Sequence, residues 1–479
     1  MSSVLFESVA SWWPELILSL GALGVILLGV CARSRQPAWQ LTWLTVLASA
    51  VALWRVPVPP TTNPFFGLII CDPLSLAFRW LALGVTAITL LLAMGSREAG
   101  LPSHGEYPGL VLLIGVGLMV MAEANHLLMA YVAMELVSLS SYVLVGFLQD
   151  QRAAEASLKY LLFGALSSGV MLVGMSLIFG LTGGLAFPEL LRATTILSQP
   201  MVPALLVAIT LMLAGLAFKI SMVPFHMWTP DAYEGAPIPV AALLSVGPKA
   251  AGLALLLRLM EALRPAWPHL APLVMGLTVV TMTLGNVVAL VQTNVKRLLA
   301  YSTIGQVGYV LIGFAVNTDL GLQAVLLYLV AYLFMNLGTF ACVVAVVNEA
   351  GNESIDAFRG LAQRSPMLAL LCALFLLSLA GIPPLLGFFG KFLLFGAAIQ
   401  AQQLWLALAG IINSAIALYY YVNIIRLMYL LPPAHPQPLS TPRALRLALG
   451  VCAAATLLLG LFPAQLLAWL KTASFVNLL

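Results

Sequence analysis

A succession of apolar runs, joined by short polar loops, most constrains how this 479-residue chain can fold. A helix needs about 20 apolar residues to cross the hydrocarbon core of a bilayer. Fourteen such runs can be read near residues 12–31, 40–57, 74–95, 108–122, 127–148, 157–181, 202–228, 237–263, 272–292, 298–316, 321–348, 366–399, 403–431 and 444–470. The sequence therefore predicts an all-α polytopic membrane protein of about 14 transmembrane helices.

Composition supports this fold class. Hydrophobic residues make up 62% of the chain and charged residues only 8%, whereas a soluble domain has about 25% charged residues. The net charge of +4 is spread over short loops rather than gathered in a patch, so we expect lipids and no nucleic acid as partners. The five cysteines are scattered without a CxxC pair, which favours small buried hydrophobic groups over a metal site.

Lysine and arginine residues predict the orientation. The odd-numbered loops hold Arg33, Arg35, Arg97, Arg152, Lys296, Arg297, Arg359, Arg364, Arg426, Arg443 and Arg446. The even-numbered loops hold little beyond Arg192 and Arg264, and Lys471 follows the last run. Because cytoplasmic loops carry an excess of lysine and arginine, we expect the odd loops in the cytoplasm and both termini on the periplasmic side.

Prolines interrupt two of the runs. Pro224 lies in the seventh run, and Pro383 and Pro384 lie in the twelfth. Proline has no backbone N–H, so the carbonyls of Leu379 and Ala380 should lose their helical donors. Broken helices five runs apart are typical of an internal repeat, and an odd offset makes the repeats inverted. We expect three N-terminal helices over 1–107, five-helix repeats over 108–263 and 264–431, and a final helix within 432–479.

Four ionisable residues lie deep inside apolar runs: Glu135, Lys219, Lys249 and Lys391. A charge in hydrocarbon is unfavourable by roughly 2.5–3.5 kcal/mol even on the mildest scale, so such groups are functional by default. Burial disfavours an ammonium and a nearby carboxylate favours it. Moving the charge of Glu135 toward or away from Lys219 would load or release a proton, which predicts a proton relay. A purely structural Glu135, paired with a neighbouring helix, is the alternative.

Further polar residues accompany these four. His226 lies seven residues after Lys219, so on a continuous helix the two would share a face. His226 is then either a member of the relay or a satisfied core histidine. Other polar residues inside the runs could hold water between the ionisable groups, or could simply join helices by hydrogen bonds. They are Asn286, Ser302, Gln306, Asn336 and Asn413.

Charged residues near the cytoplasmic ends of the runs are expected to have ordinary roles. Lys159 follows a glutamate by four residues, which predicts a surface ion pair. Asp231 and Glu234 are expected in a cytoplasmic loop, where they could gather protons or be merely solvated. Lys296 and Arg297 are interpreted as topology determinants.

Motifs for redox cofactors are missing from the sequence. It contains no GxGxxG after a strand, no Walker-type loop and no CxxC set. We therefore expect no cofactor in this chain, and any redox chemistry must take place in other subunits.

Two segments, LAFKISMVPFHMWTPDAYEGAP and QTNVKRLLAYSTIGQVGY, resemble the antiporter-like subunits of respiratory complex I and their relatives in cation/proton antiporters. The resemblance runs from about residue 70 to 430. Lys391 in GFFGKF, where the M-type sister has glutamate, and Asn294 in QTNVKR, where the sisters usually have aspartate, favour the N branch of bacterial NADH-quinone oxidoreductases. The chain also ends soon after its last run, without the long lateral helix expected of the L-type sister.

The resemblance implies a function. The family's membrane glutamate matches Glu135, and its three buried lysines match Lys219, Lys249 and Lys391. It implies a proton-translocating subunit in the bacterial inner membrane, coupled to electron transfer from NADH to quinone elsewhere in the complex. NADH, FMN, iron–sulfur clusters and quinone would belong to partner subunits, and the M-type sister and the small K-, J- and A-type subunits would be neighbours. A subunit of a sodium/proton antiporter and a non-conducting structural subunit stay as alternatives.

Overall fold

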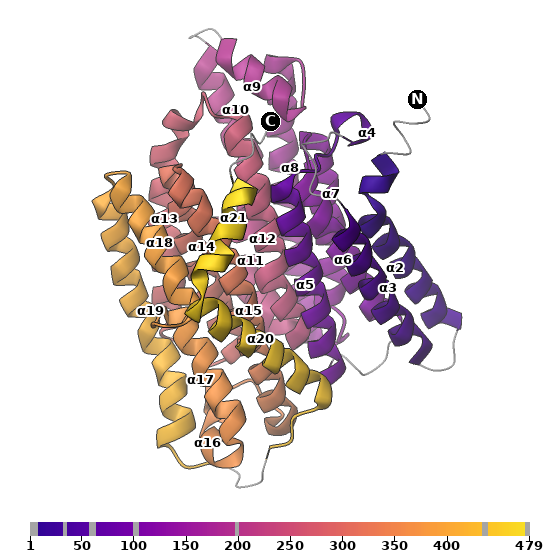
Figure 1. The fold of residues 1–479 in the computed structure, drawn as a ribbon, viewed down its shortest axis with the longest axis vertical. Helices are drawn as coiled ribbons and strands as arrows, with labels where there is room; N and C mark the ends of the chain where they lie inside the picture. Colours follow the sequence, from indigo (N-terminus) through magenta and orange to yellow (C-terminus); the bar gives the residue numbers. More distant parts are fainter. Residues whose placement is uncertain are drawn as a thin grey trace.

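The computed structural model describes residues 8–31, 36–56, 64–98, 105–196, 201–433 and 439–474. These residues form an elongated bundle of helices (Figure 1), and their only β pairing consists of three isolated antiparallel bridges. The longer helices are α2 (Trp13–Cys31), α3 (Gln36–Arg55), α5 (Pro73–Gly95), α6 (Glu106–Glu123), α7 (Leu127–Val145), α8 (Gln151–Thr182), α10 (Val202–Ile220), α12 (Ile238–Ala262), α13 (Trp267–Ala289), α14 (Val295–Val316), α15 (Asp319–Ala350), α17 (Pro366–Ala380), α18 (Leu386–Gln400), α19 (Leu404–Leu430), α20 (Arg443–Leu461) and α21 (Pro463–Ser474). Shorter helical turns are α4 (Pro64–Gly67), α9 (Phe187–Ile196), α11 (Trp228–Gly235), η2 (Ile355–Phe358) and α16 (Leu361–Arg364).

The predicted all-α membrane fold is confirmed. Twelve helices of the described chain are long and apolar enough to cross a membrane, and α17 and α18 are shorter apolar helices. The second predicted run forms α3, which is less apolar and is not among the twelve. The last run differs from expectation because it is two helices, α20 and α21, rather than one. Pro463 opens the second, since a proline cannot continue the hydrogen bonding of the helix before it.

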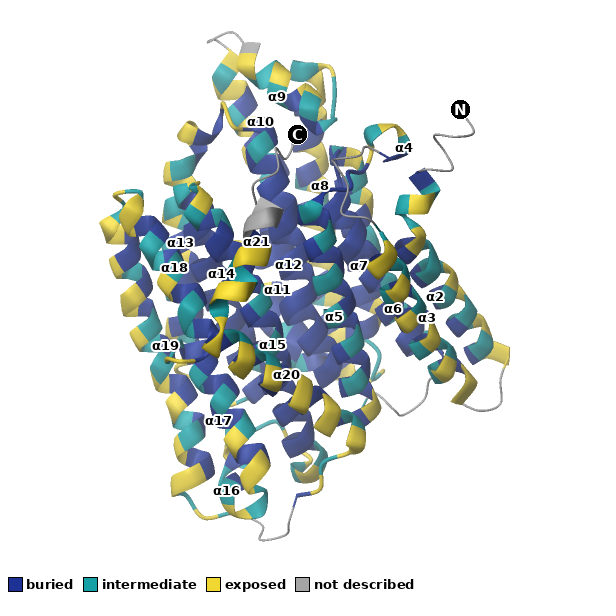
Figure 2. Cartoon of the chain, in the orientation of Figure 1, coloured by how far each residue is buried: buried dark blue, intermediate teal, exposed yellow. Residues whose placement is uncertain are grey.

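The centre of the molecule is formed by α12, α14 and α15. The most apolar stretch of α12 is completely buried, whereas those of α2, α8, α13 and α19 are only one-third buried. Figure 2 shows this contrast, with buried residues in the middle of the bundle and exposed residues around it. An outer helix with an apolar exposed face suits contact with lipid or with another subunit. The central helix α12 carries Lys249, which is therefore enclosed by protein on all sides.

Both predicted broken helices are broken. The first half of the seventh run, α10, ends at Ile220, and Ser221 follows in the left-handed conformation with a φ of 63°. The chain becomes helical again at Trp228 in α11. In the twelfth run, α17 ends at Ala380, Gly381 has a φ of 91°, and α18 begins at Leu386. The two breaks place helix ends inside the bundle. These ends carry backbone N–H and C=O groups that have no partner within their own helix.

Candidate functional site

Lys219 and Glu135 each bind a different serine, and they form no direct ion pair within the described structure. The ammonium of Lys219, which is fully buried, donates to Ser138 Oγ at 2.8 Å. Ser138 lies on α7 three residues after Glu135, and thus on the same face of that helix. Glu135 is half-buried and accepts a hydrogen bond of 2.5 Å from Ser168 Oγ of α8. The expected neighbourhood of Glu135 and Lys219 therefore exists, with Ser138 holding the amine.

Lys249 is held by aromatic rings. It is 1% exposed, and its Nζ has no hydrogen-bond partner in the part of the chain that the structure describes. Nζ lies 4.5 Å from the ring centroid of Trp228 and 5.4 Å from that of Tyr233, both on α11. A cation over an aromatic face is stabilised by the quadrupole of the ring. Lys249 thus differs from Lys219 and Lys391 in having aromatic rings rather than hydrogen-bond acceptors around its amine among the described residues.

Trp228 lies between Lys219 and Lys249. Its Nε1 donates to the carbonyl of Phe218, the residue before Lys219, at 3.0 Å, while its ring faces Lys249. The ring also stacks on Tyr160 with centroids 4.2 Å apart. The break in the seventh run is what allows this arrangement, because α11 begins with Trp228 beside the end of α10. The aromatic role of Trp228 was not predicted from the sequence.

Lys391 occupies the second helix break. Its Nζ donates to the carbonyls of Leu379 at 2.9 Å and Ala380 at 3.1 Å, the two carbonyls expected to lose their donors. It also lies 4.4 Å from the ring centroid of Tyr309. The end of α17 carries the negative pole of the helix dipole, which stabilises a cation. Lys391 is 3% exposed, so these backbone and ring contacts replace water around the amine.

A buried polar network continues from Lys391. Gln306 donates to the same carbonyl of Leu379 at 3.2 Å and to Tyr421 at 3.0 Å. Ser302 contacts Tyr421 at 2.5 Å, and Asn286 joins Tyr309, Tyr420 and Asn413. Four of the five predicted polar residues, Asn286, Ser302, Gln306 and Asn413, thus lie in one network. Tyr420, a further polar residue inside an apolar run that the sequence suggested, also lies in this network, whereas Tyr309 and Tyr421 were not singled out, because a tyrosine in an apolar run gives no signal of its polar end.

The fifth predicted polar residue, Asn336, lies elsewhere. Its amide donates to Ser245 Oγ at 2.5 Å, and Ser245 is one turn before Lys249 on α12. The side-chain oxygen of Asn336 is buried without a hydrogen-bond partner among the described residues. Asn336 therefore belongs to the surroundings of Lys249 and extends them toward α15.

His226 does not share a helical face with Lys219, so that prediction is wrong. A shared face requires the helix to continue through Pro224 to His226. Instead, α10 ends at Ile220, and the next seven residues are not in that helix. Ser221 N–H and Met222 N–H cap the end of α10 by bonding to the carbonyl of Ala217. His226 is 8% exposed, and its Nδ1 has no partner in the described ranges.

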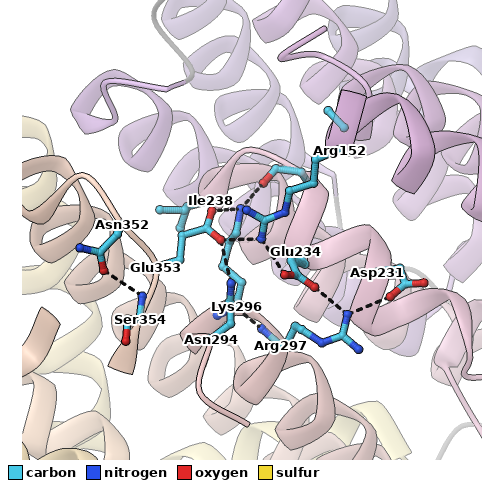
Figure 3. A network of polar contacts seen from close by, with 12 residues as sticks. Arg152, Asp231, Glu234, Ile238, Asn294, Lys296, Arg297, Asn352, Glu353 and Ser354 are labelled. Atoms are coloured by element: carbon cyan, nitrogen blue, oxygen red, sulfur yellow. Dashed lines mark hydrogen bonds and ion pairs between the residues drawn. The ribbon is translucent and has the colours of Figure 1, made fainter. Parts of the chain in front are cut away.

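A second polar network, the end network (Figure 3), corrects the predicted placement of Asp231 and Glu234. Asp231 and Glu234 lie in α11 rather than in a loop, because the seventh run resumes as a helix. Lys296, which the sequence interprets as a topology determinant, is only 1% exposed and lies inside this network. Its Nζ lies 2.5 Å from Glu353 and donates to the carbonyl of Ala236 at 2.8 Å.

Arginines connect the acidic groups of this end network. Arg297 pairs with Asp231 at 2.9 Å and with Glu234 at 2.6 Å. Arg152 pairs with Glu234 at 2.9 Å and with Glu353 at 2.7 Å. The predicted surface pair of Lys159 with Glu155 is confirmed at 2.7 Å. The network joins loops that the sequence assigned to the same side of the membrane.

Five further charges are buried and were not singled out in the sequence: Glu15, Asp72, Arg79, Glu123 and Arg258. Arg79 and Arg258 lie inside predicted runs, so the rule applied to the lysines could have found them. Glu15 and Glu123 lie near the ends of runs, where a charge is usually solvated. Their burial depends on neighbouring helices, which a single run does not show.

The comparisons with known proteins identify the family of this chain. The family model described as NADH:quinone oxidoreductase/Mrp antiporter, TM matches residues 124–417, which contain all four predicted relay residues. The chain therefore belongs to this family of antiporter-like membrane subunits.

Individual relatives identify the branch of the family. NADH-quinone oxidoreductase subunit N of Anaeromyxobacter sp. (strain Fw109-5) is 42% identical, over 96% of this chain and 95% of that protein. NAD(P)H-quinone oxidoreductase subunit 2 of Gloeobacter violaceus is 42% identical, over 94% of this chain and 90% of that protein. A chain of respiratory complex I from Thermus thermophilus superposes with a TM-score of 0.79 and 32% identity, covering 95% of this chain and 98% of that one. The predicted assignment to the subunit N branch is confirmed.

Proposed function

We propose that this chain translocates protons in the membrane arm of an NADH-quinone oxidoreductase. The observation that carries the proposal is the placement of Lys219, Lys249 and Lys391, which are 0%, 1% and 3% exposed and lie at or beside two helix breaks. Buried amines near free backbone groups can exchange protons when a neighbouring charge changes. Electron transfer from NADH to quinone would take place in other subunits, which would hold NADH, FMN, iron–sulfur clusters and quinone.

The proposed path begins at Glu135 and ends beyond Lys391. Ser138 stands between the carboxylate and the first amine, and Trp228 stands between the first and second amines. Asn336 and then the network of Gln306 and Tyr421 extend toward the third amine. Water would complete the connections, and we assign His226 no step because no contact between described residues joins it to Lys219.

The orientation that we propose places the end network in the cytoplasm and both termini in the periplasm, in a bacterial inner membrane. The network contains Arg152, Lys296 and Arg297, which come from odd-numbered loops, in agreement with the excess of positive charge expected in cytoplasmic loops. The proposed neighbours are the M-type sister subunit and the small K-, J- and A-type subunits, with lipid covering the remaining apolar surface.

A subunit of a sodium/proton antiporter is the second candidate, because the family model covers both kinds of complex. A chain of the Mrp complex from Dietzia sp. superposes with a TM-score of 0.86, but at 23% identity this likeness concerns the fold alone. Purification from native membranes distinguishes the two candidates. The oxidoreductase subunit should co-purify with NADH:quinone activity, and an antiporter subunit should not.

Replacement of Lys219 by alanine tests the proposed relay. In vesicles that contain the assembled complex, we expect K219A and E135A to lose most proton pumping, because each removes a proton-binding group from the path. The matched control is K159A, which removes an exposed lysine that forms a surface ion pair. Pumping should stay near the wild-type level in K159A. Unchanged pumping in assembled K219A complex would refute the relay.

A further inference from the structure

A buried cluster of charges joins the three helices α2, α5 and α6, which lie together at one side of Figure 1. Arg79 of α5 donates through Nε to Glu15 Oε1 at 2.8 Å and through Nη2 to Glu15 Oε2 at 2.6 Å. Its Nη2 also donates to the carbonyl of Ser11 at 3.0 Å. Glu123, the last residue of α6, approaches Arg79 Nε at 3.0 Å. All three charged side chains are 0–1% exposed.

The two carboxylates are not equivalent. Arg79 Nε has one hydrogen, and that hydrogen is directed to Glu15. The contact with Glu123 is therefore electrostatic, and neither oxygen of Glu123 accepts a well-formed hydrogen bond among the described residues, where the indole N–H of Trp12 is the nearby donor. Glu15 is bound in a bidentate manner, the strongest arrangement for a guanidinium and a carboxylate. A buried carboxylate without donors is unfavourable unless it gains a proton.

The charges near the cluster leave one negative charge unbalanced. Arg258 of α12 binds Asp72 through two hydrogen bonds of 2.9 and 2.8 Å, which forms a balanced pair. Arg258 Nε donates to the carbonyl of Ala122, next to Glu123. Among the described residues, Arg79 is then the one positive charge near Glu15 and Glu123 that is not already balanced by another carboxylate. Two carboxylates that share one arginine in a buried site cannot both be well stabilised as anions.

The groups that face Glu123 come from every element packed around it. They are Trp12 just before α2, Glu15 in the first turn of α2, Arg79 of α5, Arg258 of α12, and Cys71 and Asp72 in the segment before α5. Burial, with the nearby Glu123 carboxylate, raises the pKa of the Cys71 thiol to about 12. Burial alone would raise the pKa of Asp72, but pairing with Arg258 lowers it. Asp72 therefore remains an anion, and Cys71 remains a neutral thiol.

We propose that this cluster is a proton-binding site in which Glu123 takes up and releases one proton. Uptake converts the Glu123 carboxylate to a carboxylic acid and leaves one carboxylate and one guanidinium in the cluster. The proposal goes beyond the lysine relay and does not depend on it. Glu123 lies at the opposite end of α6 from Glu106, about 26 Å away at ~1.5 Å per residue.

Infrared spectroscopy of the complex in lipid vesicles tests the site, because a protonated carboxyl has its own C=O band. The wild type should show such a band, which shifts in D₂O and disappears as the pH rises. E123Q, which has the size of the protonated side chain, should lack this band. E15Q should also lack it at neutral pH, because Glu123 then has Arg79 to itself and ionises. E349Q, which changes an ion-paired glutamate on α15, should keep it.

Several outcomes would contradict the proposal. A wild-type complex without a titrating carboxyl band would mean that both glutamates are anions. A band that persists in E123Q would belong to another residue, and one that persists in E15Q would show that Arg79 does not control the site. If E123Q does not assemble, E123D provides the test, because it should retain a carboxyl band with a displaced titration. None of these measurements depends on proton pumping, so they are independent of the outcome for K219A.

Discussion

At the residue scale, the three buried lysines differ in what replaces water around each amine. Lys219 has a hydroxyl, Lys249 has two aromatic faces, and Lys391 has two carbonyls and a ring. Carbonyl oxygens at a helix end and an aromatic face stabilise an ammonium through different interactions, a helix dipole in one case and a ring quadrupole in the other. The three amines therefore offer a proton three unequal sites, which is the arrangement that a stepwise transfer needs.

Ser138 should matter for proton binding at Lys219. In S138A, the ammonium loses its hydroxyl acceptor, and a hydrogen bond to a charged group contributes about 1.5–3 kcal/mol. We expect reduced pumping in S138A, with a smaller loss than in K219A. The control is S141A on the same helix, whose hydroxyl donates to the carbonyl of Val137. Equal pumping in S138A and S141A would show that Ser138 does not tune the lysine.

At the element scale, the two breaks expose backbone groups in different ways. After α17, the carbonyls of Leu379 and Ala380 are taken up by Lys391, as the proline positions predicted. After α10, the left-handed Ser221 caps the helix and no lysine binds the freed carbonyls. The prolines predict that a helix breaks, but local capping decides where it ends and which carbonyls stay available.

Gly381 should be sensitive to substitution at the second break. It has a φ of 91°, and a Cβ at this position would lie 3.0 Å from Lys391 Cδ. We expect G381A to be less stable by about 1–2 kcal/mol, because an L-residue is strained in this conformation. It should also pump less, because the Lys391 stem must move. The control is G396A in α18, where a Cβ meets open space. Thermal unfolding and vesicle pumping measure both effects, and G381A that matches G396A would contradict the packing argument.

At the scale of the whole molecule, the end network holds separate parts of the bundle together. Glu353, between α15 and η2, contacts Arg152 at the start of α8 and Lys296 of α14. Burial alone would raise the pKa of Glu353, but the charges of Lys296 and Arg152 and a hydrogen bond from Asn294 lower it. The folded protein therefore binds the proton of Glu353 more weakly than the unfolded chain does.

The stability of the molecule should accordingly fall in acid in a way that depends on Glu353. A lowered folded-state pKa contributes stability above the unfolded glutamate pKa of about 4.3, and that stability is lost as the pH falls through the folded-state value. We expect the wild type to unfold at a higher temperature than E353Q at pH 7, with the difference shrinking below about pH 4. E349Q serves as a control at an exposed ion pair. A difference that does not change with pH would exclude this contribution.

The sequence by itself determined the membrane fold, the breaks and the positions of the lysines, because hydropathy and the missing N–H of proline act within a single segment. It also determined the subunit N branch through local motifs around Lys391 and Asn294. Only the tertiary structure decided the partners of each charge: Ser138 for Lys219, the α11 rings for Lys249, and the tyrosines that connect Gln306 and Asn286. The cluster of Glu15, Arg79 and Glu123 arises in the same way, since burial and pairing depend on helices far apart in the chain that pack against each other.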